Sequence, residues 1–378
     1  MRTSFIERRL SAWLMRQTSV SSVRKVASVG GAIASELGNV RSDNQDKAVI
    51  IHSVDAGGSS YAVAVVADGI GGMQDGAKCA ALGVAAFVSE FVLQSKQWNS
   101  NTESCVTRAM RAANEAVHEQ YGGRGGTTFV ALVASPPSGI FWASAGDSRL
   151  YSFAEGKLNQ VSVDDTIAGQ LGKQGRASSE HSKILQYVGM GKDFFPHIER
   201  FNAHGDHVFL LTTDGVHFLD ENSDVFTLIL QNAIDPGVVA RRLVDLAKWC
   251  GGPDNATVAI LPAVASISKP SFDDKDTLTI WDAFGELQID ICSISQKSGG
   301  RERTISEARQ QKILDENQDQ DLRLFETVQS PEPEAKASAK PNDPAVKTTK
   351  PRSRKPKAKT QVKATPPQLD IKFSSKPE

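Results

Sequence analysis

Apolar and polar positions divide residues 31–265 into short apolar runs separated by turn-forming residues. The runs are rich in Val, Ile, Phe and Thr and are bounded by Gly, Asp, Pro or Ser, which is typical of β-strands. Strands are predicted at 47–53, 60–67, 127–134, 139–145, 149–153, 207–213 and 256–261. Several of these strands follow one another through short turns with no helix between them. Antiparallel pairing is therefore favoured over repeated strand–helix–strand units.

Three longer segments repeat apolar residues with the period of a helix. They predict helices at 76–95, 101–120 and 236–250. The first is rich in alanine and other small residues, which suits close packing. No uninterrupted apolar run approaches about 20 residues, so no transmembrane segment is expected.

Two segments differ from this alternation. Residues 1–30 carry six basic residues against one acidic residue, with apolar residues at helical spacing. We interpret this leader as a helix that packs on the domain or frays; the alternatives are an amphipathic membrane-surface or partner-binding helix, or a transit peptide. Residues 164–200 are polar and punctuated by glycine, which is typical of a mobile flap beside a site.

The pattern weakens in an extension over residues 266–328. Its apolar positions between 278 and 291 predict one more hairpin, and residues 302–328 predict a charged helix. Residues 329–378 hold nine of the sixteen prolines. This composition cannot bury enough apolar surface to fold, so a disordered tail is predicted.

The net charge of -1 conceals an asymmetry between the body and the tail. Residues 329–378 contain twelve Lys and Arg against five Asp and Glu, which leaves a charge of -8 on the preceding residues. The tail is interpreted as a tether or solubilising segment. The alternatives are docking to a partner and, through this tail alone, binding of nucleic acid.

Four scattered cysteines, Cys79, Cys105, Cys250 and Cys292, show no C-x-x-C spacing. They indicate free thiols in a reducing compartment rather than a disulfide framework or a zinc site. The N-terminus lacks the apolar core of a signal peptide. A cytoplasmic location is therefore expected.

Aspartates stand at the ends of several apolar runs. Asp68, Asp147 and Asp214 each follow a predicted strand, and Asp254 precedes one. Strand ends can bring carboxylates together, and clustered carboxylates need a counter-charge, which hard divalent cations usually supply. The sequence thus suggests a metal site built from the ends of several strands.

Each of these motifs also has a simpler interpretation. An Asp-Gly pair is most often a hairpin turn, Asp254-Asn255 an Asx-turn, and Asp147-Ser148-Arg149 a salt-bridged turn. The stretch from Arg41 to Asp46 alone is typical of a solvated turn, although an arginine there is suited to gripping a phosphoryl group.

The motifs become specific when they are taken together and in order. The chain resembles the metal-dependent PPM family of Ser/Thr phosphatases, also called PP2C-type, over about residues 31–262 and in its bacterial form. The matching pieces are Arg41…Asn44-Gln45-Asp46, Val66-Ala67-Asp68-Gly69-Ile70-Gly71-Gly72, Gly126-Thr127-Thr128, Ala145-Gly146-Asp147-Ser148-Arg149, Leu211-Thr212-Thr213-Asp214-Gly215 and Asp254-Asn255-Ala256-Thr257. This resemblance implies an α+β fold, a four-layer αββα sandwich of two packed antiparallel sheets flanked by helices.

The resemblance also implies roles for individual residues. Asp68 would bridge two Mn²⁺ or Mg²⁺ ions, with the Gly69 carbonyl on one ion and with Asp214 and Asp254 on the other. Asp147 would help to bind a third, weaker metal. Asp46 would hold a metal-bound water, and Arg41 would grip the substrate phosphate. Two such cations activate a bridging water for in-line attack, so no nucleophilic side chain is needed.

One position departs from the family pattern. Many members have histidine after the Asp-Gly pair, proposed as a general acid, whereas this chain has Ile70. The general acid is therefore unassigned. The remaining histidines considered fall outside the expected positions and are interpreted as structural or surface residues: His52, His118, His181, His204, His207 and His217.

Two functions follow from these observations. The first is a protein Ser/Thr phosphatase that acts on phosphoprotein substrates and opposes a Ser/Thr kinase. The second is a catalytically weak or inactive relative that binds phosphoproteins or has a regulatory role. The first is favoured, because three carboxylates in one cleft are hard to explain without cations.

Overall fold

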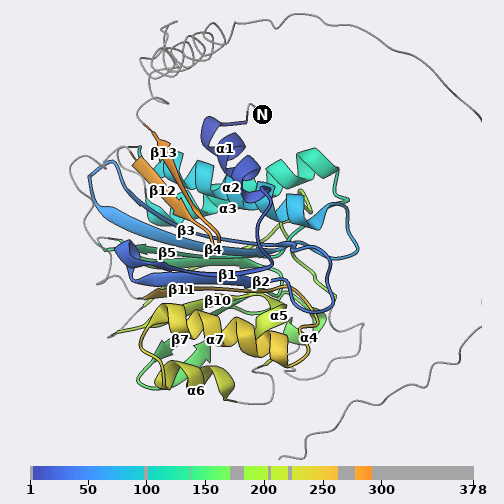
Figure 1. The fold of residues 1–378 in the computed structure, drawn as a ribbon. Coiled ribbons are helices and arrows are strands. Elements are labelled where there is room, and N and C mark those ends of the chain that lie inside the picture. Colours follow the sequence, from blue (N-terminus) through green and yellow to red (C-terminus); the bar gives the residue numbers. More distant parts are fainter. Residues whose placement is uncertain are drawn as a thin grey trace, which may run out of the picture. The chain divides into compact units, whose positions relative to one another are not determined.

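Two antiparallel sheets lie face to face, with helices on both outer faces, in the computed structural model of the chain (Figure 1). The structure describes residues 3–97, 101–136, 138–170, 183–202, 206–219, 224–262 and 277–291. The expected αββα sandwich is confirmed. The charged helix predicted at 302–328 and the tail predicted at 329–378 lie outside the described residues.

One sheet contains six described strands in the order β1-β2-β11-β10-β7-β8. Their bounds are β1 (Ser21–Val26), β2 (Gly31–Glu36), β7 (Arg149–Ala154), β8 (Lys157–Gln160), β10 (Val208–Thr212) and β11 (Ala256–Pro262). The other sheet contains seven described strands in the order β13-β12-β3-β4-β5-β6-β9. Their bounds are β3 (Asp46–Val54), β4 (Ser60–Asp68), β5 (Phe129–Ser135), β6 (Gly139–Ala145), β9 (His197–Phe201), β12 (Thr277–Trp281) and β13 (Glu286–Asp290).

The described helices separate into two outer layers (Figure 1). The seven-stranded sheet is covered by α1 (Phe5–Leu14), α2 (Gly76–Ser95) and α3 (Thr102–Tyr121). The six-stranded sheet is covered by α5 (Asp214–His217), α6 (Val225–Gln231) and α7 (Pro236–Trp249). The short helix α4 (Ile167–Gln170) follows β8, and a 3-10 turn (Ala27–Val29) joins β1 to β2. By length and hydropathy α2 could span a membrane, but 78% of its most apolar window is buried in the fold.

Strands buried on both faces explain the continuous apolar runs of the sequence. In β3, Ile50 faces the other sheet, whereas its neighbours Val49 and Ile51 pack with the α1–α3 layer. Adjacent residues of one strand thus belong to two different apolar layers. The layer between the sheets fixes their separation and so holds together the strand ends that both sheets contribute.

The leader does not stand apart from the domain. Ser4 caps α1 by accepting a hydrogen bond from the Glu7 amide at 3.0 Å, and Ile6 and Leu10 are fully buried in the core shared with α2. Residues 21–26 form β1, an edge strand paired with β2. The boundary placed at residue 30 is therefore corrected: of the interpretations, the packed helix is the one that the structure shows.

The boundary placed at residue 265 also divides one structural unit. The predicted hairpin over 278–291 is present as β12 and β13, and β12 pairs with β3 as part of the seven-stranded sheet. The segment interpreted as a flap, 164–200, ends in β9, which pairs with β6 at the opposite edge. Residues 171–182 lie outside the described residues.

Truncation of α1 tests whether the leader is part of the folded domain. Leu10→Ala removes a fully buried side chain and is expected to lower the free energy of unfolding by about 2–5 kcal/mol. The matched control is Phe5→Ala in the same helix, where the side chain is 43% exposed and the expected loss is below about 1 kcal/mol. Urea unfolding measures both. Equal, small effects would show that α1 is not docked in solution.

Candidate active site

The register of the β3–β4 hairpin brings two aspartates together. Asp46 is the first residue of β3 and Asp68 the last of β4, and the two are paired directly across the strands. Opposite residues of antiparallel strands have Cα atoms about 4.5–5.5 Å apart. The hairpin therefore places the two carboxylates, which are separated in the sequence by both of its strands, at one end of the sheet.

The second sheet contributes two more aspartates in the same way. Asp214 follows the end of β10, and Asp254 precedes the start of β11, its antiparallel neighbour. The Thr213 amide donates to the Thr257 carbonyl at 3.1 Å and holds the strand ends together. Gly215 is required here, since a Cβ at this position would lie 1.9 Å from the carbonyl oxygen of Asn255.

Two threonines fix the backbone of Asp68. The Thr128 amide donates to the Asp68 carbonyl at 2.8 Å, and the Thr128 hydroxyl accepts from the Asp68 amide at 3.0 Å. The Thr127 hydroxyl donates to the same carbonyl at 2.7 Å. The motif Gly126-Thr127-Thr128 thus holds the strand end that presents Asp68.

Asn255 connects the two halves of the site. Its Oδ1 accepts from the Gln45 amide at 2.8 Å, and its Nδ2 donates to the carbonyls of Leu37 at 2.9 Å and Asp43 at 3.1 Å. The loop before β3 and the loop before β11 are therefore joined by one buried amide side chain. The sequence Asp254-Asn255 alone does not show that Asn255 joins these two loops.

Asp46 carries a buried oxygen that needs a partner. Its side chain is 4% exposed, and Oδ2 accepts from the Thr213 hydroxyl at 3.0 Å. Among the described residues, Oδ1 has no hydrogen-bond partner. An unpaired carboxylate oxygen in a buried site is costly unless a donor or a cation meets it. A carboxylate oxygen is a donor that Mg²⁺ and Mn²⁺ prefer, so Asp46 fits a site for either ion.

Crowding raises the pKa values of the clustered aspartates. Burial, followed by the charge of Asp214, raises the pKa of Asp46 to about 7. Burial and the charges of Asp46 and Asp214 raise the pKa of Asp68 well above its usual range. The pKa of Asp214 is also raised, by its dense surroundings and then by Asp254, although its side chain still reaches solvent.

Arg41 supplies the positive charge at one side of the cluster. It donates to Asp254 Oδ2 at 2.5 Å, and Asp254 Oδ1 accepts from the Asn255 amide at 2.8 Å. Both oxygens of Asp254 are therefore engaged within the protein. Among the described residues, no three His, Cys, Asp or Glu side chains form a ready metal cage. A cation at Asp254 would compete with Arg41 for Oδ2.

Asp147 lies next to this group on the loop after β6. Burial, followed by the charge of Asp214, raises its pKa to about 7. The salt-bridged turn considered for this motif exists, but with another partner: Arg149 forms a fork with Asp164, its NH2 lying 2.7 Å from Oδ2. Asp147 therefore keeps no basic partner within its own motif.

The first residues of the flap segment hold the Asp147 loop in place. Asp165 is 3% exposed and accepts from the Gly146 amide at 3.1 Å and from His197 Nε2 at 2.9 Å. Its own amide donates to the Gly146 carbonyl at 2.9 Å. Sequence reasoning missed both Asp165 and His197, because no local pattern relates residues 32 positions apart.

The described histidines do not fill the position of the missing general acid. His217 is buried beside the Thr212 hydroxyl, and burial lowers its pKa well below the usual range. His118 contacts the Gly189 carbonyl, and His207 the Ser152 hydroxyl. His181 and His204 lie outside the described residues.

Comparison with known proteins identifies the family. The sequence profile of the protein phosphatase 2C family matches residues 39–246, more than half of the chain. The chain belongs to this family. The serine/threonine protein phosphatase PstP of Mycobacterium tuberculosis (strain ATCC 25618 / H37Rv) is 28% identical over 291 residues, which cover 74% of this chain. The match takes in 52% of PstP, so the chain spans about half the length of that relative.

Solved structures agree with the sandwich. The catalytic domain of PstP in complex with two manganese ions matches with a TM-score of 0.50 and 25% identity, over 64% of this chain and 99% of that one. The S. agalactiae serine/threonine phosphatase matches with a TM-score of 0.53 and 23% identity, over 62% and 98% respectively. The second likeness concerns the fold alone.

The raised pKa values predict that the metal-free protein loses stability as the pH rises. The unfolded carboxyls have pKa values near 3.9, whereas Asp46 and Asp147 titrate at about 7 in the fold. The folded state therefore binds more protons between these values, and its stability falls with increasing pH. In EDTA we expect the melting temperature to fall by several degrees between roughly pH 5 and pH 8.

Two controls accompany this measurement. Asp46→Asn should flatten the slope, since it removes one carboxyl whose pKa is raised. Saturating Mn²⁺ should reverse the slope, because protons then compete with the cation. A metal-free melting temperature that increases with pH over this range would contradict the crowding of the aspartates.

Proposed function

We propose that the chain is a metal-dependent phosphatase that removes phosphate from phosphoserine and phosphothreonine of proteins. The observation that carries the proposal is the convergence of Asp46 and Asp68 from one sheet with Asp214 and Asp254 from the other, beside the Arg41 guanidinium. Family membership and similarity to PstP support it. The alternative, a phosphoprotein-binding relative without activity, is less favoured because each aspartate expected from the family is present.

Each residue has a proposed part. Asp68, the Gly69 carbonyl, Asp214 and Asp254 would hold two Mn²⁺ or Mg²⁺ ions, and Asp147 would contribute to a third. Bound cations of this kind supply an activated water and neutralise the phosphoryl oxygens. Asp46, with its unpaired Oδ1, would orient that water.

Arg41 would bind the phosphate of the substrate. Its guanidinium lies over Gly71, where a Cβ would be 3.5 Å from NH1, and it would leave Asp254 when a cation takes that carboxylate. An arginine fork matches the geometry of phosphoryl oxygens.

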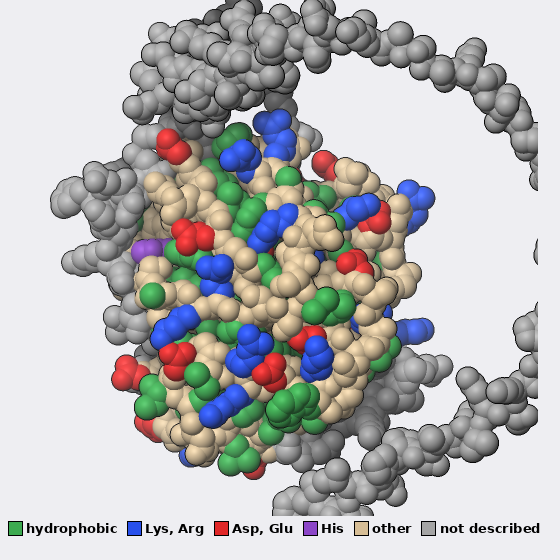
Figure 2. Space-filling model, in the orientation of Figure 1, with side chains coloured by type: hydrophobic (Ala, Val, Ile, Leu, Met, Phe, Trp, Pro, Cys, Tyr) green, Lys and Arg blue, Asp and Glu red, His purple; other side chains and the backbone are tan. Residues whose placement is uncertain are grey.

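Partners and location follow from this role. A phosphoprotein substrate and an opposing Ser/Thr kinase are the proposed partners. On the face shown in Figure 2, basic and acidic side chains are intermingled, which does not favour nucleic acid there; the basic tail is the proposed place for such contacts or for another partner. Among the described residues the cysteines form no disulfide, which supports the proposed cytoplasmic location.

Replacement of the proposed metal ligands tests the activity. Asp68→Asn and Asp214→Asn keep the shape of the side chain but remove its charge, and each is expected to lower kcat for p-nitrophenyl phosphate with Mn²⁺ by about 10³-fold or more. EDTA should abolish the wild-type activity. Asp245→Asn, on the far face of α7, is the control that keeps full activity. A wild-type chain that binds phosphopeptides but releases no phosphate would support the binding module instead.

Arg41 should have opposite effects on phosphate and on metal. Arg41→Ala is expected to raise KM for phosphopeptides about tenfold or more, because it removes a charged phosphate contact. It is also expected to tighten Mn²⁺ binding several-fold, since the cation no longer competes with a guanidinium at Asp254. Isothermal calorimetry measures the second effect. Weaker Mn²⁺ binding in Arg41→Ala would contradict the competition inferred from the 2.5 Å pair.

A further inference from the structure

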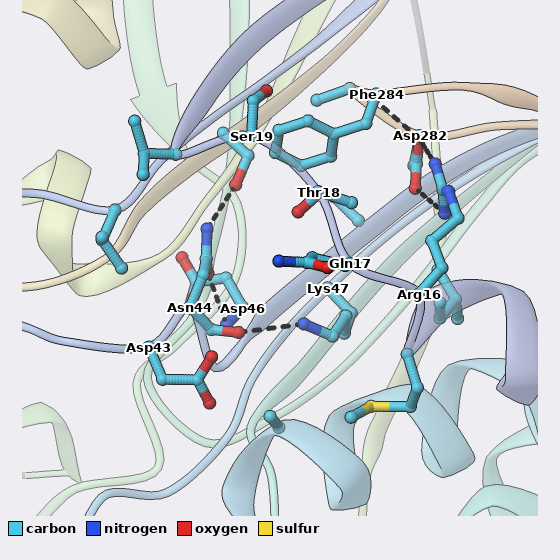
Figure 3. A pocket seen from close by; sticks show the side chains of 18 of the residues that line it. Arg16, Gln17, Thr18, Ser19, Asp43, Asn44, Asp46, Lys47, Asp282 and Phe284 are labelled. Atoms are coloured by element: carbon cyan, nitrogen blue, oxygen red, sulfur yellow. Dashed lines mark hydrogen bonds and ion pairs between the residues drawn. The ribbon is translucent and has the colours of Figure 1, made fainter. Parts of the chain in front are cut away.

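A cavity of about 380 Å³ opens beside the aspartate cluster (Figure 3). Its walls come from residues 14–20, which end α1 and connect it to β1, from the β12–β13 turn at 282–284, and from the loop and strand start at 42–48. The first two segments lie outside the residues that match the family profile. Residues 33–37, in β2 and at its end, and Ala77 of α2 complete the lining.

The cavity borders a stretch of β3 that has only one partner among the described strands. β4 pairs with β3 along its whole length from Asp46 to Val54, but β12 pairs only with residues 50–52. Beyond Trp281 the chain turns away, so among the described strands none covers β3 on that side at residues 46–49. Asp46, Lys47 and Ala48 line the cavity at this edge.

The lining combines apolar walls with amide and charged groups of both signs. Figure 3 shows the Phe284 ring, the Gln17 amide and the Lys47 ammonium group round the same space. Lys47 donates to the Asn44 carbonyl at 2.9 Å. Arg16, also in the wall, forms an ion pair with Asp282 at 2.8 Å, and its Cζ lies 3.9 Å from the centroid of the Trp13 ring. This lining suits a polypeptide with an apolar side chain better than a free, highly charged ligand.

The same loop forms a wall of the cavity and a part of the candidate active site. Arg41 stands at its start beside Asp254, and Asp46 at its end belongs to both the cavity and the carboxylate cluster. A substrate whose phosphate reaches Arg41 would therefore have its neighbouring residues at the mouth of the cavity.

We propose that this cavity is a specificity subsite for the polypeptide next to the phosphorylated residue. The peptide places an apolar side chain in the cavity, against Phe284. The inference rests on the proposed phosphatase function and adds a preference for phosphoprotein segments that carry an apolar residue at one flanking position.

Phosphothreonine peptides of equal length test the subsite. Each peptide carries Phe, Ala or Asp at a single flanking position, and every flanking position is tested in turn. The full chain with Mn²⁺ is assayed on these peptides and, for comparison, on p-nitrophenyl phosphate. We expect Phe at one position to raise kcat/KM about tenfold, as one well-filled apolar pocket does. Phe284→Ala removes the wall and Thr18→Trp fills the cavity from its rim. Both variants should abolish the preference for the Phe peptide by raising its KM. Both should keep the rate of p-nitrophenyl phosphate hydrolysis within about twofold of the wild-type rate.

The control and the contrary outcomes are distinct. Leu228→Ala removes a side chain that is 56% exposed on α6 and should change neither substrate. No flanking preference in the wild-type chain, or equal losses on both substrates in Thr18→Trp, would overturn the subsite. Faster p-nitrophenyl phosphate hydrolysis in that variant would overturn it in favour of the chain's own tail as occupant. Peptide binding measured by fluorescence anisotropy in EDTA should show the same ranking, so the subsite is tested even if no phosphate is released.

Discussion

Repulsion among carboxylates gathered at one end of the sandwich constrains the rest of this structure. Burial and mutual charge raise the pKa values of Asp46, Asp68 and Asp214, which means that the fold holds them together against an electrostatic cost. One arginine offsets part of that cost at Asp254. Bound protons or cations must offset the rest of the electrostatic cost, and at neutral pH cations are the more effective counter-charge.

The scaffold opposes this repulsion with backbone contacts rather than with more charge. Thr127 and Thr128 hold the end of β4, Asn255 joins the two loops, and Gly215 allows two backbones to approach closely. The apolar layer between the sheets sets the distance between the pair from β3 and β4 and the pair that flanks β10 and β11. The carboxylates therefore come from rigid strand ends, which is how a preorganised metal site is best supported.

Much of this arrangement could be predicted from the sequence, because it is local. Continuous apolar runs mark the central strands and aspartates mark their ends, so the same pattern predicts both the hairpins and the carboxylates. Strands β1 and β2 are not predicted by such runs. β1 buries only Val26 fully, and β2 consists mostly of small residues and becomes central only through its pairing with β11. Contacts between distant residues, such as the Asp165–His197 pair, leave no local pattern.

The segments that the sequence set apart as a leader and an extension matter for how the site can differ from its relatives. Because α1 is anchored by buried Ile6 and Leu10, the connector that follows it has a fixed path beside the loop bearing Asp46. The β12–β13 turn is fixed in the same way, through the pairing of β12 with β3. Changes in either segment would alter the wall next to the active site without touching a carboxylate. Selectivity and chemistry can thus vary independently in this fold, because different parts of the chain carry them.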